Sequence, residues 1–403
     1  MFAISAARGQ NDPEIDEALR AALEVCVERR TLLGHRAGVV TCDFNADGTR
    51  VLTGSSDATA ILWNAVSGVP IVYFMGHTQP LVAALLSPDG ERVLTASEDG
   101  TARLWLVSDG STAAVLEADA GPVRSAAYGA DGTRVATGHR DGSVVIWNTK
   151  NGERVALLVG HTKDVLSVRF SEGAIRVVTA SADGTARLWD IAAAKEISRM
   201  VGFAGPVLAA ELDRAAARVL AAGSDPIARI FDAKNGHRLV ELKGHEGPIL
   251  AAAFSPAGDR ALTASEDGTA RVWDAASGLS LHTLRGHEAL VCAAVFSRDG
   301  SRVATASEDG TGRVWDAATG RLLATLRGHD SWVHTIRFRG DGGALLTASD
   351  DHTARIWNPT TFGERNSLRG HGGPVLVARY SPDGTKILTA SSDGTARLWR
   401  AAD

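Results

Sequence analysis

The sequence predicts an all-β protein made of nine tandem repeats of equal length. Gly-His pairs recur at steps of 42 residues or multiples of 42, and an aspartate follows each histidine by 22 residues, with an aromatic residue six further on. The histidines are His35, His77, His161, His245, His287, His329 and His371, and Asp119 and Phe203 stand at the two remaining positions. A fixed period of this length is the signature of a repeat architecture, in which each unit forms one supersecondary element.

Each repeat contains the pattern of four short strands, as repeat six illustrates. Residues 248–254 are predicted to form a strand, and the Pro and Gly residues within 255–259 indicate a turn. Two further strands are expected over residues 260–265 and 269–274, joined by the hairpin turn Glu266-Asp267-Gly268. A fourth strand is expected over residues 279–285, after a short connection.

The spacing of Gly-His, the aspartate-bearing turn and Trp-Asp resembles the WD40-repeat family from about residue 28 to residue 400. This resemblance implies a β-propeller of four-stranded blades, in which the strand before each Gly-His belongs to the preceding blade. The last repeat then lacks one strand after Trp399, and residues 28–33 stand where the other repeats place it. We therefore expect residues 28–403 to form the propeller and residues 28–33 to close it.

The number of blades requires a separate argument, because propellers usually have four to eight. No linker or insertion separates any two repeats, and blades left outside a smaller ring would expose sheet edges. The sequence thus favours one ring of nine blades, each spanning about 40° instead of about 51°. The alternative is a seven- or eight-bladed ring whose extra blades are exchanged between two chains.

Residues 1–27 are predicted to form a tail and one short helix. Asp12 is a suitable N-cap and Pro13 suits the first helical position, while Ile15, Leu19 and Leu23 follow at helical spacing together with Ala22. The helix is compatible with a tether, a cap on the propeller or a contact between chains.

The composition argues against several classes of function. The net charge of -5 carries no long single-sign block, so neither general nucleic-acid binding nor membrane binding is expected. The three cysteines are scattered, which disfavours a disulfide framework, and no cofactor or metal is expected. Neither a signal peptide nor an apolar stretch of eighteen residues is evident, so a soluble protein that is not secreted is expected. The scattered cysteines favour the reducing cytoplasm, and a monomeric propeller is expected.

Most repeats also contain a serine, a histidine and an aspartate, a combination found in hydrolases. Seven copies argue against one active site. The family resemblance instead implies a structural tetrad in which the Trp indole bonds the Ser hydroxyl, the hydroxyl bonds the imidazole and the imidazole bonds the carboxylate. The implied tetrads are His35, Ser55, Asp57 and Trp63; His77, Ser97, Asp99 and Trp105; His161, Ser181, Asp183 and Trp189; His245, Ser265, Asp267 and Trp273; His287, Ser307, Asp309 and Trp315; His329, Ser349, Asp351 and Trp357; His371, Ser391, Asp393 and Trp399.

Two repeats depart from this pattern. Repeat three has Asp119 at the histidine position and His139 at the serine position, which suggests an ion pair with its partners exchanged. Repeat five has Phe203, Gly223 and Phe231, so we expect an aromatic contact there and the least polar, locally weakest blade.

The resemblance also implies that partners bind the face where the first strands of the blades begin. Residues five after the histidine position are mostly apolar there: Val40, Val82, Leu166, Leu208, Leu250 and Leu376. The acidic residues expected around them are Glu98, Glu266, Glu308 and Asp350. Such a face suits a peptide with hydrophobic anchors and basic residues, although the same residues are also compatible with a dry channel rim.

Repeat eight is the strongest candidate for a partner site. It places Trp332 and His334 at the two first-strand positions beside Asp350, and Trp332 is the only tryptophan outside the repeated aromatic position. In repeat three, Arg124 and Arg140 are candidates for binding an acidic group.

These features favour a non-enzymatic interaction scaffold. The repeats resemble propellers attached to multidomain bacterial signalling or defence proteins. The alternatives are an enzyme that uses the central channel, for which no catalytic motif is evident, and a structural protein that self-associates through its N-terminal helix.

Overall fold

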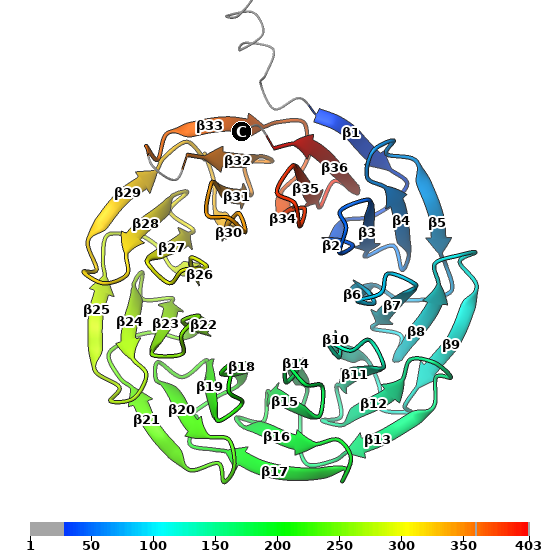
Figure 1. Ribbon diagram of the computed structural model, residues 1–403, viewed down its shortest axis with the longest axis horizontal. Coiled ribbons are helices and arrows are strands. Elements are labelled where there is room, and N and C mark those ends of the chain that lie inside the picture. The colour runs from blue at the N-terminus through cyan, green and yellow to red at the C-terminus, as the bar shows by residue number, and fades with distance from the viewer. Residues whose placement is uncertain (1–27, 359–360, 402–403) are drawn as a thin grey trace, which may run out of the picture.

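The protein forms a closed ring of nine blades (Figure 1). The computed structural model describes residues 28–358 and 361–401. These residues contain 36 strands in nine four-stranded antiparallel sheets and no helix. The predicted all-β class and the nine blades are therefore confirmed, while the predicted N-terminal helix lies outside the described residues.

The strands follow one another from the inside of each blade to its outside. Blades 1 to 3 contain β2 (Val39–Phe44), β3 (Arg50–Ser55), β4 (Ala60–Asn64) and β5 (Pro70–Phe74); β6 (Leu81–Leu86), β7 (Arg92–Ser97), β8 (Thr101–Leu106) and β9 (Thr112–Glu117); and β10 (Val123–Tyr128), β11 (Arg134–His139), β12 (Val144–Asn148) and β13 (Arg154–Leu158). Blades 4 to 6 contain β14 (Val165–Phe170), β15 (Arg176–Ser181), β16 (Ala186–Asp190) and β17 (Lys195–Met200); β18 (Val207–Leu212), β19 (Arg218–Gly223), β20 (Ala228–Asp232) and β21 (Arg238–Leu242); and β22 (Ile249–Phe254), β23 (Arg260–Ser265), β24 (Ala270–Asp274) and β25 (Ser280–Leu284).

The remaining three blades keep the same order, except that the last blade takes its outer strand from the start of the chain. Blades 7 to 9 contain β26 (Val291–Phe296), β27 (Arg302–Ser307), β28 (Gly312–Asp316) and β29 (Leu322–Leu326); β30 (Val333–Phe338), β31 (Leu345–Ser349), β32 (Ala354–Trp357) and β33 (Glu364–Leu368); and β34 (Val375–Tyr380), β35 (Lys386–Ser391), β36 (Thr395–Arg400) and β1 (Glu28–Leu33).

Side-chain burial explains the sequence of each strand. The second strand of a blade lies between two neighbouring blades and is buried on both faces, so Val, Leu, Ala, Thr and Ser follow one another in β7 and its equivalents. The outer strand is covered on one face only. In β5 the side chains of Val72 and Phe74 are buried, whereas those of Ile71 and Tyr73 are exposed.

The hydrophobic core is divided into nine clusters, one at each junction between consecutive blades. The repeated aromatic residue packs against the preceding blade, as Trp105 of blade 2 does against Phe74 of blade 1, with 5.7 Å between ring centroids. Each of the nine blades thus has a buried apolar contact on both sides. This arrangement excludes the alternative of a smaller ring with exchanged blades.

The two ends of the described chain meet in one blade. The outer strand β1 pairs antiparallel with β36, with Leu32 opposite Ala396. On the neighbouring side, Arg30 Nε donates to the carbonyl of Ser67 in blade 1 at 2.8 Å, and Lys386 Nζ donates to the carbonyl of Gly48 at 3.0 Å. The first strand therefore joins blade 9 to blade 1. Among the described residues there is no helix long and apolar enough to span a membrane.

Candidate partner-binding face

A buried hydrogen-bond chain holds the histidine-bearing turn onto each regular blade. In blade 6, Trp273 Nε1 donates to Thr263 Oγ1 at 2.8 Å, and Thr263 Oγ1 lies 2.8 Å from His245 Nε2. His245 Nδ1 lies 2.8 Å from Asp267 Oδ2. The hydroxyl group of this chain therefore belongs to Thr263 and not to Ser265, which corrects the tetrad inferred from the sequence.

The register of the strands explains this correction. Trp273 lies opposite Ala261, so Thr263 is two residues away along β23 and Ser265 is four residues away, or about 13 Å. The indole therefore reaches only the threonine. The threonines that take this place in the seven regular repeats are Thr53, Thr95, Thr179, Thr263, Thr305, Thr347 and Thr389.

The serines instead fix the turn that carries the aspartate. Ser265 Oγ donates to the carbonyl of Gly247 at 3.0 Å and accepts the backbone N–H of Asp267 at 3.1 Å. The serines of the other regular repeats make the corresponding bonds, namely Ser55, Ser97, Ser181, Ser307, Ser349 and Ser391. Because the serine hydroxyl bonds backbone atoms, it is not arranged as a nucleophile beside the imidazole.

The protonation states of the network follow from burial and hydrogen bonding. Burial lowers the pKa of His245 although Asp267 opposes this shift, so the imidazole is neutral at pH 7. Burial raises the pKa of Asp267, but hydrogen bonds from Thr269, Glu246 and His245 outweigh it and bring that pKa to about 2. The neutral imidazole thus donates from Nδ1 to a carboxylate and accepts the threonine O–H at Nε2, which satisfies every member of the chain.

Blade 3 does not contain the exchanged ion pair suggested by its sequence. His139 is buried, with Nε2 at 2.9 Å from Thr137 Oγ1 and Nδ1 at 3.3 Å from the carbonyl of Gly121. Trp147 still donates to Thr137 at 2.9 Å, whereas Asp119 is exposed and adopts a φ of 52°. The imidazole therefore reaches the threonine from the serine position and bonds a backbone carbonyl where the other repeats provide a carboxylate.

Blade 5 combines the expected aromatic contact with an ion pair that was not expected. The rings of Phe203 and Phe231 lie 6.0 Å apart. Arg229 is buried, its Nη1 lies 2.9 Å from Asp225 Oδ2, and its guanidinium lies 4.7 Å from the ring centroid of Phe203. An arginine thus replaces the missing histidine as the partner of the aspartate, and the least polar interior expected for blade 5 stays a prediction.

A β-bulge recurs in the inner strand of every blade, and one residue of that strand lies within it. The pairing of the first two strands shifts register at the same place in all nine blades. The residue within each shift is the one five positions after the histidine position, and a bulge redirects such a side chain. These bulge residues are Val40, Val82, Arg124, Leu166, Leu208, Leu250, Cys292, His334 and Leu376.

The acidic residues predicted to surround this face lie beside the first strands. In each case the N–H of the acidic residue donates to the carbonyl three residues after the histidine position, as Asp350 does to Trp332 at 3.0 Å. Glu98, Glu266 and Glu308 make the same bond to Pro80, Pro248 and Leu290. The structure therefore places the bulge residues and the acidic residues on the same end of the blades.

Blade 8 brings its three candidate residues into one group. The side chain of Trp332 is 47% exposed, and His334 Nε2 lies 2.6 Å from Asp350 Oδ1. On the side of blade 7, the thiol of Cys292 donates to the carbonyl of Val333 at 3.0 Å, and burial raises the pKa of that thiol to about 11. An exposed indole thus stands next to an imidazole–carboxylate pair, on a strand whose backbone is bonded to blade 7.

The arginines of blade 3 have a different arrangement from the one expected. Arg124 Nε lies 2.9 Å from Asp164 of blade 4, and its Nη1 lies 3.1 Å from Glu98 of blade 2. Two carboxylates already compensate its charge, so Arg124 joins three blades and does not offer a vacant site for an acidic group. Arg140 is exposed on the same blade.

Comparison with known families decides the relationship of the chain. Residues 26–274 match the family described as IFT122 first beta-propeller, and residues 278–316, 320–358 and 363–400 match the WD domain, G-beta repeat. The chain belongs to the WD40-repeat β-propeller family. Propellers of this family are typically scaffolds for protein interactions.

Several solved structures share the fold of this chain. The crystal structure of the computationally designed Ika8 protein is 24% identical in sequence, covers 93% of this chain and 99% of its own, and gives a TM-score of 0.69. The C-terminal WD40 domain of Sif2 is 18% identical, covers 94% of this chain and 99% of its own, and gives a TM-score of 0.66. No functionally curated protein matches at a significant level.

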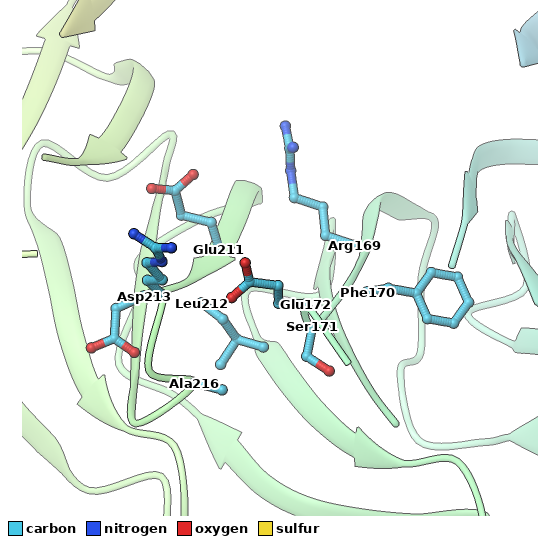
Figure 2. Close-up of a pocket in the computed structure, with 9 residues that line it drawn as sticks. Arg169, Phe170, Ser171, Glu172, Glu211, Leu212, Asp213 and Ala216 are labelled. Atoms are coloured by element: carbon cyan, nitrogen blue, oxygen red, sulfur yellow. The ribbon is translucent and has the colours of Figure 1, made fainter. Parts of the chain in front are cut away.

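Hollows also occur at the opposite ends of the inner strands of this WD40 propeller. A pocket of about 260 Å³ lies between blades 4 and 5, where Figure 2 shows Arg169, Glu172 and Glu211 around it. Burial raises the pKa of Glu211, whose Oε1 accepts the N–H of Phe254 in blade 6 at 2.6 Å. This carboxyl group therefore connects two blades. A second pocket, of about 540 Å³, lies between blades 7 and 8.

Proposed function

We propose that this WD40 propeller is a non-catalytic recognition module that binds a protein or peptide partner on the face formed by the bulge residues, with Trp332 as its anchor. The observation that carries the proposal is the exposure of Trp332 beside the His334–Asp350 pair. Exposed tryptophans are favoured anchors at interfaces, because a large apolar surface is buried on binding at a small cost in side-chain entropy.

The surroundings of Trp332 define the chemistry of the partner. Leu376 lies at the bulge position of the next blade and offers an apolar contact, and Glu308 in the preceding blade supplies negative charge. A peptide with one or two hydrophobic side chains flanked by Lys or Arg matches this combination.

A displayed peptide library selected on the purified protein tests this proposal. Selected peptides should combine an apolar anchor with basic residues, and Trp332→Ala should weaken their binding by about thirtyfold, the effect of removing an interface hot spot. Leu239→Ala is the matched control, because Leu239 is similarly exposed but lies on the outer strand of blade 5. Equal affinities of the wild type and Trp332→Ala would refute the proposed anchor.

The proposal extends to the cellular role. The closely similar Ala- and Arg-rich repeats support a place in the cytoplasm of a bacterium, as the recognition part of a signalling or defence assembly. Affinity capture in the source organism, with the wild type and Trp332→Ala compared, tests this role. A Trp332-dependent partner without such a function would refute the assignment to signalling or defence but leave the binding face in place.

A further inference from the structure

The outer strand of blade 1 exposes a continuous apolar strip. Val69, Ile71, Tyr73 and Met75 alternate along and beside β5, and Val66 precedes them in the turn before the strand. Each of these side chains is between 46% and 66% exposed. The opposite face of the same strand is buried against blade 2 through Val72 and Phe74, so β5 is apolar on both faces.

Most other blades carry polar residues at the positions equivalent to Tyr73 and Met75. The equivalents of Tyr73 are Val115, Leu157, Arg199, Glu241, Thr283, Thr325 and Ser367, and those of Met75 are Glu117, Val159, Val201, Lys243, Arg285, Arg327 and Arg369. Of blades 1 to 8, only blades 1 and 3 are apolar at all three positions that correspond to Ile71, Tyr73 and Met75. Since a solvent-facing strand normally carries polar side chains there, the strip on blade 1 indicates a covered surface.

The start of β1 lies next to this strip. Arg30 Nε donates to the carbonyl of Ser67 at 2.8 Å, and the Cα of Gly68 is so close to Arg30 that a Cβ there would lie 2.6 Å from the arginine Cγ. Ser67 and Gly68 form the turn between Val66 and Val69. Arg30 in β1 therefore contacts blade 1 at the end of the strip at which β5 begins.

The sequence of that preceding segment matches the strip in polarity and length. Ile15, Leu19 and Leu23 recur at the spacing of one helical face, whereas Glu17 and Arg20 fall outside this face. A helix over residues 12–23 is about 18 Å long. The strand segment from Val69 to Met75 spans about 20 Å. Residues 24–27 can extend over about 14 Å, which is enough for the helix to fold back along β5.

We propose that residues 12–23 form an amphipathic helix that packs its Ile15, Leu19 and Leu23 face onto the apolar strip of blade 1. The covalent connection selects blade 1, because a four-residue linker does not reach the similar strip on blade 3, two blades away. Docking covers Ile71, Tyr73 and Met75 and makes the segment a permanent part of the ring's outer surface at the place where the ring is closed.

Amide hydrogen exchange of the full chain tests the proposal. Tyr73→Arg is the disrupting variant, and it is compatible with the fold because Arg199 stands at the same position of blade 4. The matched control is Leu157→Arg at the same position of the blade 3 strip. Residues 13–25 should be protected from exchange in the wild type and in Leu157→Arg, and Tyr73→Arg should accelerate their exchange at least tenfold.

Three outcomes would overturn the proposal. The first is an absence of protection in residues 13–25 of the wild type, and the second is protection that survives Tyr73→Arg. The third is a dimer in light scattering that Tyr73→Arg dissociates, because a second copy of the chain would then cover the strip. Exchange in β31 and β32 serves as the internal check that Tyr73→Arg leaves the ring folded.

Discussion

His334 Nε2 and Asp350 Oδ1 lie 2.6 Å apart although the two residues are sixteen positions apart in the sequence. The bulge in β30 directs the imidazole towards the turn after β31, and the N–H of Asp350 donates to the carbonyl of Trp332. Both side chains are about one-third exposed. The pair therefore holds a fixed donor and acceptor beside the exposed indole, as a preorganised binding site requires.

The coupling between these two side chains is the first prediction. Asp350→Ala and His334→Ala should each weaken peptide binding about threefold to tenfold, and the double variant should lose little more than either single variant, because each substitution breaks the same pair. Titration of one selected peptide against the four proteins measures the coupling. Strictly additive losses would show that the two residues contact the peptide independently.

The second prediction concerns the hydroxyl in the buried network. Thr263→Val leaves the Trp273 N–H and the His245 Nε2 atom without partners, so we expect a loss of about 2 to 4 kcal/mol in the free energy of unfolding. Thr263→Ser keeps the hydroxyl and should retain most of the stability. Urea unfolding compares the two variants, and equal stability of Thr263→Val and Thr263→Ser would contradict the network.

The third prediction is a loss of stability on mild acidification. Burial lowers the folded-state pKa of six histidines: His35, His77, His139, His161, His245 and His287. Below pH 6.5 the histidines bind protons in the unfolded chain but not in the folded one. Each histidine therefore lowers the free energy of unfolding by up to about 1.4 kcal/mol per pH unit. The urea concentration at the unfolding midpoint should therefore decrease as the pH is lowered from 7.5 to 5.5.

Acid conditions below this window add a second effect from the aspartates. Asp267 has a folded pKa of about 2, so its contribution is present above pH 3.8 and disappears as the pH falls towards 2. A urea midpoint that stays constant or increases as the pH is lowered from 7.5 to 5.5 would contradict the prediction that the buried histidines are neutral.

The fourth prediction concerns the buried ion pair of blade 5. Asp225→Ala removes the carboxylate nearest to the Arg229 guanidinium, and the arginine side chain is only 5% exposed. We therefore expect the free energy of unfolding to decrease by about 3 to 5 kcal/mol. Arg238→Ala removes a half-exposed arginine from Glu241, which keeps Lys243 as a partner, and should lower the free energy of unfolding by less than about 1 kcal/mol. Similar unfolding midpoints for the two variants would show that the ion pair in blade 5 contributes little to the stability of the protein.

The repeat period determined most of the fold in advance. A spacing of 42 residues with Gly-His and Trp at fixed offsets specified nine equal sheets, because any other number would leave apolar faces such as those of Val72 and Phe74 without a neighbour. The pairing of β1 with β36 followed from the strand missing after Trp399.

The site was less predictable because proximity in a sheet depends on register. The short sequence distance to Asp267 favours Ser265, whereas the indole reaches Thr263. A signal for the threonine exists in the sequence: repeat five, which lacks both His and Trp, is also the one with Ala221 in place of threonine. The partners of Arg124 come from blades 2 and 4, and no pattern within one repeat reveals contacts between blades.

The pairing of β1 with β36 also determines how the ring responds to mechanical load. Glu28 lies opposite Trp399, so residues 28 and 400 are at the same end of the two antiparallel strands. A force that pulls these residues apart acts on one backbone hydrogen bond after another and unzips the pair, whereas the other eight sheets are not in the path of the load. A modest tension therefore opens the ring at a single joint and leaves eight complete blades folded.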